Sequence, residues 1–340
     1  MFKEIYIKKR KMLLTLLSFL IIATLTISMI SELSAADITI DPKTSGGLKK
    51  AMETAKNGDT ILLKNGVYTG KNNVNLIINK NINIEGLGSK VVLDGEGNNH
   101  IFTITGETVS LKKLKVTNGY STASGGAINN VKGNLIVKDC TFTNNLAITG
   151  GAICTYNKLT VDNCTFTNNK AANYGGAIDS FGKVNINNCT FKNNQATKDG
   201  GGAIVSGGNP GDSLTVKKST FINNRAEDGG AIDTYIKATI SSCTFTNNRA
   251  MKKDAGAIDF RYGHSTVNSC TFKNNQAKRN GGAICIGVHS GYTTKVEIVN
   301  SKFTNNIAGK IYNAIYTYRG SKFTQKNVSI TPKFGTKVKI

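Results

Sequence analysis

The residue after each Gly-Gly-Ala-Ile motif is the first candidate for chemistry. The motif begins at residues 125, 150, 175, 201, 229 and 281, with Ala-Gly-Ala-Ile at 255 as a variant. The next position holds, in order, Asn129, Cys154, Asp179, Val205, Asp233, Asp259 and Cys285. If the motif recurs once per turn of a coil, Asp233 and Asp259 lie about one strand spacing apart, ~4.8 Å. Two carboxyl groups this close raise one pKa and could act as acid and base on a glycan, or bind Ca²⁺.

Other side chains near this column could face a sugar. Arg261, Tyr235 and Tyr262 are its neighbours in sequence, and Asp179 comes from an earlier copy of the motif. The catalytic candidates are therefore Asp179, Asp233, Asp259 and Arg261. The alternative is a ladder of short polar side chains on the surface, because the residue after an inward-pointing Ile points outward. Under that alternative, nearby Arg and Lys side chains partly neutralise the carboxylates. Apart from Ca²⁺, we expect no cofactor.

A second motif shows how these residues are positioned. Cys/Ser-x-Phe-x-Asn-Asn recurs at intervals of 24 to 31 residues, beginning at Cys140, Cys164, Cys189, Ser219, Cys243, Cys270 and Ser301. Apolar side chains stand mostly five and three residues before each Cys or Ser. Such alternation predicts short strands with one buried face, and the fixed order of motifs predicts one turn of a coil per repeat. The fold class is therefore all-β, a parallel β-helix solenoid.

In-register stacking of these turns predicts columns of identical side chains. The aromatic column would contain Phe142, Phe166, Phe191, Phe221, Phe245, Phe272 and Phe303. The Cys140, Cys164, Cys189, Cys243 and Cys270 side chains would form an inward ladder of small groups. The spacing of the turns also permits disulfides between neighbours such as Cys140 and Cys164. No histidine joins a cysteine at a spacing typical of metal ligands.

The ends of the chain differ from the repeats. Residues 1–36 combine a basic segment, an apolar run and Ser34-Ala-Ala36, which predicts an export signal that is cleaved after Ala36 or kept as an anchor. Residues 37–120 are expected to form the first turns, with a helix over 48–56 that covers the open end. Residues 121–320 are the repeat coil, and 321–340 are a degenerate C-terminal end.

The formal net charge of +22 favours anionic partners. For an exported chain these are acidic wall polymers, acidic glycans or lipid headgroups. The lysines are scattered rather than clustered with stacking aromatics, so nucleic acid is not expected as a partner. Contact with a membrane is expected only through the N-terminal segment, if it is not cleaved.

The two motifs together resemble the repeat of polymorphic outer-membrane proteins. Asn57-Gly-Asp-Thr-Ile-Leu-Leu63, Gly66-Val-Tyr68 and Ile82-Asn-Ile-Glu-Gly86 look like segments of the adhesin-like surface proteins of methanogenic archaea. The resemblance implies a right-handed parallel β-helix, the pectin lyase-like fold, on a secreted or cell-surface protein. That fold also carries enzymes, so it does not decide function.

Three hypotheses for function follow. The preferred one is a non-enzymatic adhesin-like protein that binds cell wall polymer, glycan or another cell. The first alternative is a polysaccharide lyase or glycoside hydrolase that uses the aspartate column. The second is a structural component of the cell surface.

Overall fold

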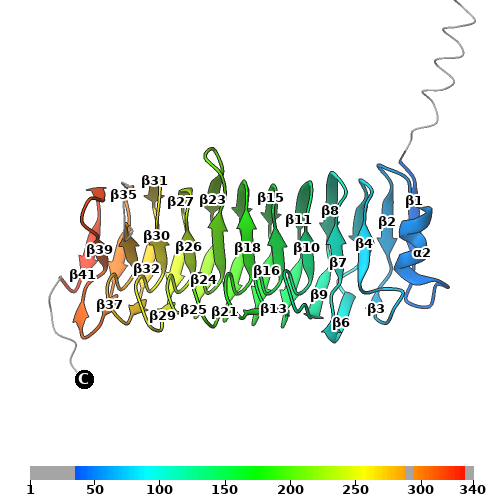
Figure 1. Cartoon of the computed structure of the whole chain (residues 1–340), viewed down its shortest axis with the longest axis horizontal. Coiled ribbons are helices and arrows are strands. Elements are labelled where there is room, and N and C mark those ends of the chain that lie inside the picture. The colour runs from blue at the N-terminus through cyan, green and yellow to red at the C-terminus, as the bar shows by residue number, and fades with distance from the viewer. Residues whose placement is uncertain (1–34, 288–293, 334–340) are drawn as a thin grey trace, which may run out of the picture. The chain divides into compact units, whose positions relative to one another are not determined.

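The computed structural model describes residues 35–287 and 294–333. From Asp37 the chain winds into a parallel β-solenoid of about 11 turns, which agrees with the right-handed β-helix predicted from the repeats. Figure 1 shows successive turns side by side along one axis. The predicted export signal lies almost entirely in residues 1–34, outside the described residues. Within the described residues, no helix is long and apolar enough to cross a membrane.

Four sheets, here called A to D, run along the coil, and a full turn passes through A, B, D and C in that order. Sheet A contains β1 (Asp37–Ile40), β2 (Thr60–Leu63), β5 (Asn83–Gly86), β8 (Thr108–Lys112), β11 (Asn134–Lys138), β15 (Leu159–Asp162), β19 (Val184–Asn187), β23 (Ser213–Lys217), β27 (Lys237–Ser241), β31 (His264–Asn268), β35 (Lys295–Val299) and β40 (Lys322–Lys326). Sheet B contains β3 (Gly66–Tyr68), β6 (Val91–Asn99), β9 (Lys115–Gly119), β12 (Thr141–Thr143), β16 (Thr165–Thr167), β20 (Thr190–Lys192), β24 (Thr220–Ile222), β28 (Thr244–Thr246), β32 (Thr271–Lys273), β36 (Lys302–Thr304) and β41 (Ser329–Thr331).

Sheet C contains the strands that follow the Gly-Gly-Ala turns and is the sheet that positions the aspartate column. Its strands are β4 (Leu76–Ile78), β7 (Phe102–Ile104), β10 (Ile128–Asn130), β14 (Ile153–Thr155), β18 (Ile178–Phe181), β22 (Ile204–Gly207), β26 (Ile232–Thr234), β30 (Ile258–Phe260), β34 (Ile284–Ile286) and β39 (Ile315–Thr317). Sheet D contains two-residue strands: β13 (Leu146–Ala147), β17 (Lys170–Ala171), β21 (Gln195–Ala196), β25 (Arg225–Ala226), β29 (Arg249–Ala250), β33 (Gln276–Ala277), β37 (Ile307–Ala308) and β38 (Ile311–Tyr312). All described strand pairs are parallel except β37 with β38.

The seven repeat phenylalanines form one buried stack inside the coil. Neighbouring ring centroids lie 4.6 to 4.9 Å apart and the ring planes are within 5° of parallel. This spacing equals that of adjacent strands in a sheet, because each ring belongs to one of a row of neighbouring strands. The stack fixes the register of every turn from β12 to β36, and hence the register of sheet C.

The two residues of each Asn-Asn pair have different structural roles. The first asparagine of each pair adopts the left-handed conformation, with φ between 53° and 58°, which turns the chain from sheet B to sheet D. The second is buried, in a column formed by Asn145, Asn169, Asn194, Asn224, Asn248, Asn275 and Asn306. From Asn169 onward, each Oδ1 accepts hydrogen bonds from the backbone N–H and Nδ2 of the preceding asparagine, at 2.9 to 3.0 Å. The column therefore satisfies buried polar groups that the corner would otherwise leave unpaired.

The cysteines are free, buried thiols in this structure. In the inward ladder, the Cys164 sulfur accepts a hydrogen bond from the backbone N–H of Cys140 at 3.4 Å. Ser219 and Ser301 fill the same position and accept the equivalent bond through Oγ, from Cys189 and Cys270, at 3.1 Å. The column thus bonds one turn to the next without disulfides.

A short helix caps the N-terminal end of the coil, as predicted. Helix α2 spans Gly47–Thr54 rather than 48–56 and buries Leu48, Ala51 and Met52. At the other end the coil continues further than predicted, since β40 and β41 still pair with β35 and β36. All five side chains of β40 are exposed, whereas Ile330 of β41 still packs against the core.

Candidate functional site

The aspartates that follow Gly-Gly-Ala-Ile lie inside the protein, not on its surface. Asp179, Asp233 and Asp259 are exposed by 1%, 0% and 4%. The prediction of a surface ladder was therefore wrong. The side chains do alternate away from the core, but the turn that enters the preceding strand covers them. Gly200, in the turn before β22, packs so closely on the Asp233 carboxylate of β26 that a side chain there would collide with it.

Two of the aspartates are brought together with Arg261, as the sequence suggested. Asp233 on β26 pairs in register with Asp259 on β30. Arg261 Nε and Nη2 donate to Asp233 Oδ1 and Oδ2 at 2.8 and 3.0 Å, and Nη2 lies 3.1 Å from Asp259 Oδ2. Nη2 also donates to Asp228 Oδ2 at 2.9 Å, a residue that the sequence did not single out. The result, here called the Arg261 cluster, is one buried guanidinium among the Asp228, Asp233 and Asp259 carboxylates.

The environment of the Arg261 cluster shifts its pKa values. Burial raises the pKa of Asp233 and raises that of Asp259 well above its ordinary range, and Arg261 opposes both shifts. Burial lowers the pKa of Arg261, but the Asp233 and Asp259 carboxylates outweigh burial and leave it raised. Only 13% of the Arg261 side chain is exposed, so the ion pairs between this one guanidinium and the three carboxylates lie inside the protein.

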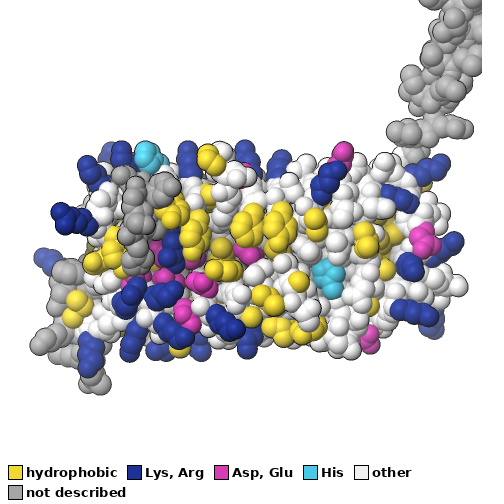
Figure 2. All heavy atoms as spheres, viewed as in Figure 1, with side chains coloured by type: hydrophobic (Ala, Val, Ile, Leu, Met, Phe, Trp, Pro, Cys, Tyr) yellow, Lys and Arg dark blue, Asp and Glu magenta, His cyan; other side chains and the backbone are white. Residues whose placement is uncertain are grey.

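Asp179 lies in a different setting, beside a hollow on the outer face of sheet C. The hollow has a volume of about 720 Å³ and is lined by Tyr156, Tyr174, Asp179, Phe181, Val205, Gly207, Gly208, Asn209 and Tyr235. We call it the sheet C groove. The Tyr156 and Phe181 rings stack at 5.5 Å with 9° between their planes and are 47% and 44% exposed. Figure 2 shows hydrophobic side chains along the middle of this face and acidic ones gathered toward its C-terminal end.

The Asp179 carboxylate is buried without a cation. Its Oδ1 atom has no hydrogen-bond partner. Burial raises the pKa of Asp179 from an ordinary 3.8 to about 6, against hydrogen bonds from Thr149 and the Ser180 backbone that lower it. No lysine or arginine is among the described groups that shift this pKa.

Comparisons with known proteins bear on the repeats. Residues 139–156, 163–180, 188–207, 218–235 and 269–287 match the Chlamydia polymorphic membrane protein repeat. The chain carries polymorphic membrane protein repeats. A comparison with curated proteins gives no significant match.

One solved structure supports the fold of these repeats, and a second match is weaker. A PL6 alginate lyase in complex with a trisaccharide matches with a TM-score of 0.52 and 17% identity, over 79% of this chain and 60% of the lyase. A mannuronic acid-specific family 6 lyase from human gut microbiota matches with a TM-score of 0.42 and 13% identity, over 87% and 80% of the two chains. At this identity the likeness shows the parallel β-helix and not an activity. This chain spans less than two thirds of the first lyase.

Three of the four aromatic residues of the groove occupy the same position of the repeat, and the sequence interpretation named only Tyr235 of the four. The third position after the motif isoleucine holds, in order, Val131, Tyr156, Phe181, Gly207, Tyr235, Arg261 and Gly287. Reading this column would have found Tyr156 and Phe181 beside Tyr235 and Arg261. Gly207 has no side chain between the Phe181 and Tyr235 positions, and this gap opens the groove above Val205.

Tyr235 links the groove to the Arg261 cluster. Its ring lines the groove, and the Arg261 guanidinium carbon lies 5.2 Å from the ring centroid, within the range of a cation–π contact. The Tyr262 ring lies 6.1 Å from Tyr235 and does not line the groove. Sheet C thus positions two neighbouring regions with different chemistry.

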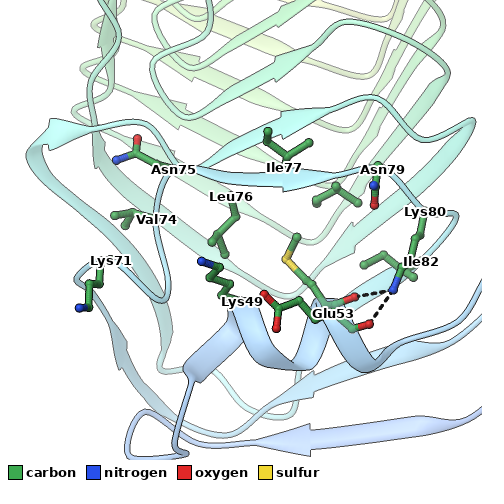
Figure 3. Close-up of a pocket in the computed structure, with 12 residues that line it drawn as sticks. Lys49, Glu53, Lys71, Val74, Asn75, Leu76, Ile77, Asn79, Lys80 and Ile82 are labelled. Carbon is green, nitrogen blue, oxygen red and sulfur yellow. Dashed lines mark hydrogen bonds between the residues drawn. The ribbon is translucent and has the colours of Figure 1, made fainter.

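A second hollow, of about 640 Å³, lies between α2 and β4 at the N-terminal end (Figure 3). Its lining combines apolar side chains of β4 with Lys49, Glu53 and Lys80. Lys80 Nζ donates to the backbone oxygens of Met52, Glu53 and Ala55 at 3.0, 2.8 and 2.6 Å. A cation at this position satisfies the last carbonyls of α2, so the hollow belongs to the cap.

The described residues contain no group of three or more His, Cys, Asp or Glu side chains arranged to hold a metal ion. In the Arg261 cluster, Arg261 occupies the space between the carboxylates that a cation would need. Ca²⁺ binding stays a prediction from the sequence alone.

Proposed function

We propose that this chain is a cell-surface, adhesin-like protein that binds glycan in the sheet C groove without chemical turnover. The observation that carries the proposal is the exposed, stacked pair of Tyr156 and Phe181 beside the groove. Flat aromatic rings offer a large apolar surface on which the C–H faces of a sugar pack, while polar groups nearby fix its orientation. The volume of the groove lies within the usual range of small-ligand sites.

The surface location rests on the repeats and on the leader. The matched repeat is described as that of a membrane protein, and residues 1–36 read as an export signal. The net charge of +22 would draw such a protein to anionic wall material. Binding that depends on this charge should weaken as salt is raised, because salt screens exposed charges.

Burial of the aspartates disfavours the enzymatic alternative. A general acid or base must come within hydrogen-bond reach of the proton it transfers. Asp233 and Asp259 are buried and held by Arg261, and only Asp179 lines the groove. The likeness to alginate lyases keeps lysis as the alternative to test, since these enzymes show that the fold can carry it.

A glycan-binding screen with the full chain tests the proposal. We expect at least one immobilised wall glycan to bind, and the Tyr156→Ala/Phe181→Ala double variant to bind at least tenfold more weakly. Phe323→Ala on β40 is the matched control, because it removes a ring that is 37% exposed and lies outside the groove. The same samples are assayed for release of unsaturated sugars from acidic polysaccharides.

Three results would contradict the proposal. Sugar release that is lost in Asp233→Asn would favour a lyase. Binding that is unchanged in the double variant would place the glycan elsewhere. No binding to any glycan would favour a purely structural component of the surface.

A further inference from the structure

The electrostatics of the sheet C groove differ from those of the protein as a whole. The chain carries a net charge of +22, yet the charged group that lines the groove is Asp179. Its side chain is 1% exposed, and its Oδ1 atom has no partner among the described residues. A buried carboxylate without a cation is costly, so this position favours a ligand that brings a positive charge.

Other carboxylates near the rim of the groove also make the electrostatic potential there negative. A hydrogen bond to Asp199 raises the pKa of Tyr174, and the Asp199, Asp179 and Asp233 charges act in the same direction. The Arg261 cluster nearby contains three carboxylates and one guanidinium. An anionic sugar entering here would meet repulsion, although the basic surface of the protein would attract it from a distance.

The aromatic lining fits the same ligand. Tyr156, Phe181, Tyr174 and Tyr235 all line the groove. The faces of such rings attract cations and also pack against the C–H groups of a pyranose. A carboxylate beside these rings therefore matches a sugar that carries an amine.

We propose that the sheet C groove binds a protonated, unacetylated amino sugar within a surface glycan. The ammonium group pairs with the Asp179 carboxylate at the wall of the groove, and the pyranose faces pack against Tyr156 and Phe181. This inference rests on the proposed function and adds the chemical class of the sugar. It excludes uronates from this groove, which leaves any contact with acidic polymers to the basic surface outside it.

The experiment compares a glucosamine tetramer with its N-acetylated counterpart, by calorimetric titration of the full chain at pH 7. Acetylation removes the charge and keeps the sugar ring. We expect the unacetylated tetramer to bind at least tenfold more tightly. Asp179→Asn should abolish this preference and leave the affinity for the acetylated tetramer within about twofold.

Two further variants serve as controls. Gly207→Leu should block both tetramers, because a Cβ at Gly207 meets only ordinary contacts with Phe181, 3.6 Å away, and the longer side chain projects into the groove. Glu107→Gln removes an exposed carboxylate just before β8 of sheet A and should change neither affinity.

The outcomes separate this inference from the proposed function. Equal binding of the two tetramers, or a preference that survives Asp179→Asn, would overturn the amino-sugar inference and leave glycan binding standing. Binding of neither tetramer, while other glycans bind, would overturn it as well, and binding of no glycan at all would overturn both. A tetralysine peptide that binds as tightly as the unacetylated tetramer would show that the groove selects an amine and not a sugar.

Discussion

Asp179 and the Asp233/Asp259 pair occupy the same position of the repeat, but their surroundings are opposite. All three carboxylates are buried. Arg261, at the end of β30, forms ion pairs with Asp233 and Asp259, whereas Phe181 and Gly207 lie near Asp179 and leave an open groove. The difference shows that the residue on the next turn, Arg261 for Asp233 and Gly207 for Asp179, decides whether the charge is satisfied internally or offered to a ligand.

The largest expected effect comes from removing the cation. Arg261→Met keeps an unbranched side chain of similar length but leaves Asp228, Asp233 and Asp259 buried together, which should destabilise the coil by about 3–5 kcal/mol at pH 7. The loss should shrink at pH 4, because the raised pKa values of Asp233 and Asp259 let both take up protons. Urea unfolding followed by circular dichroism measures both values.

Arg279→Met is the matched control for this variant. Arg279 pairs with Asp254 at 2.8 Å, but 46% of its side chain is exposed, so the loss should be much smaller. An equal loss for Arg261→Met at both pH values would show that its packing, not its charge, stabilises the cluster.

Ionisation of Asp179 should destabilise the folded state, whereas the Arg261 charge stabilises it. A buried acid whose pKa rises from 3.8 to about 6 destabilises the folded state by about 3 kcal/mol once it ionises. The folded state holds the extra proton between these values, so wild-type stability should fall as pH rises from 4 to 6. Asp179→Asn should therefore be more stable than the wild type at pH 8, and this gain should vanish below pH 4. Glu107→Gln should show no such profile, and a gain that persists at pH 3 would contradict the assignment.

A smaller effect is expected where the two regions meet. Tyr235→Leu removes the ring that Arg261 contacts and should cost about 1 kcal/mol beyond its packing. A double-mutant cycle with Arg261→Met isolates that contact, because the tyrosine should lose its coupling energy once the guanidinium is gone. Additive losses in the double variant would argue against the contact.

The smallest effect is expected for Asp259. Burial raises the pKa of Asp259 well above the ordinary range, which favours its protonated form, and an amide has nearly the same shape and polarity as that form. Asp259→Asn should alter the free energy of unfolding by less than about 0.5 kcal/mol. Asp233→Asn should cost more, since Asp233 accepts two hydrogen bonds from Arg261. Equal losses of unfolding free energy for Asp233→Asn and Asp259→Asn would show that the two carboxyl groups have the same protonation state.

The sequence predicted the fold and the neighbours within it. Two repeated motifs at nearly constant spacing require in-register turns, which is why Asp233 lies beside Asp259 and Phe142 beside Phe166 in the structure. Comparing the repeats at the third position after the motif isoleucine would also have identified Tyr156 and Phe181. The boundaries were less well predicted, since α2 begins at Gly47 and the strands continue to Thr331.

What the sequence by itself determined was the direction of each side chain relative to its own sheet, because alternation and repeat length are local properties of the chain. Only the tertiary structure decided what covers that sheet from outside. The turn around Gly200 buries Asp233, Arg261 reaches back to the preceding turn and to Asp228, and the missing side chain at Gly207 leaves a groove beside Asp179. These features depend on how far a turn folds back and how far a side chain reaches across neighbouring turns, and a period of two residues carries no information on either.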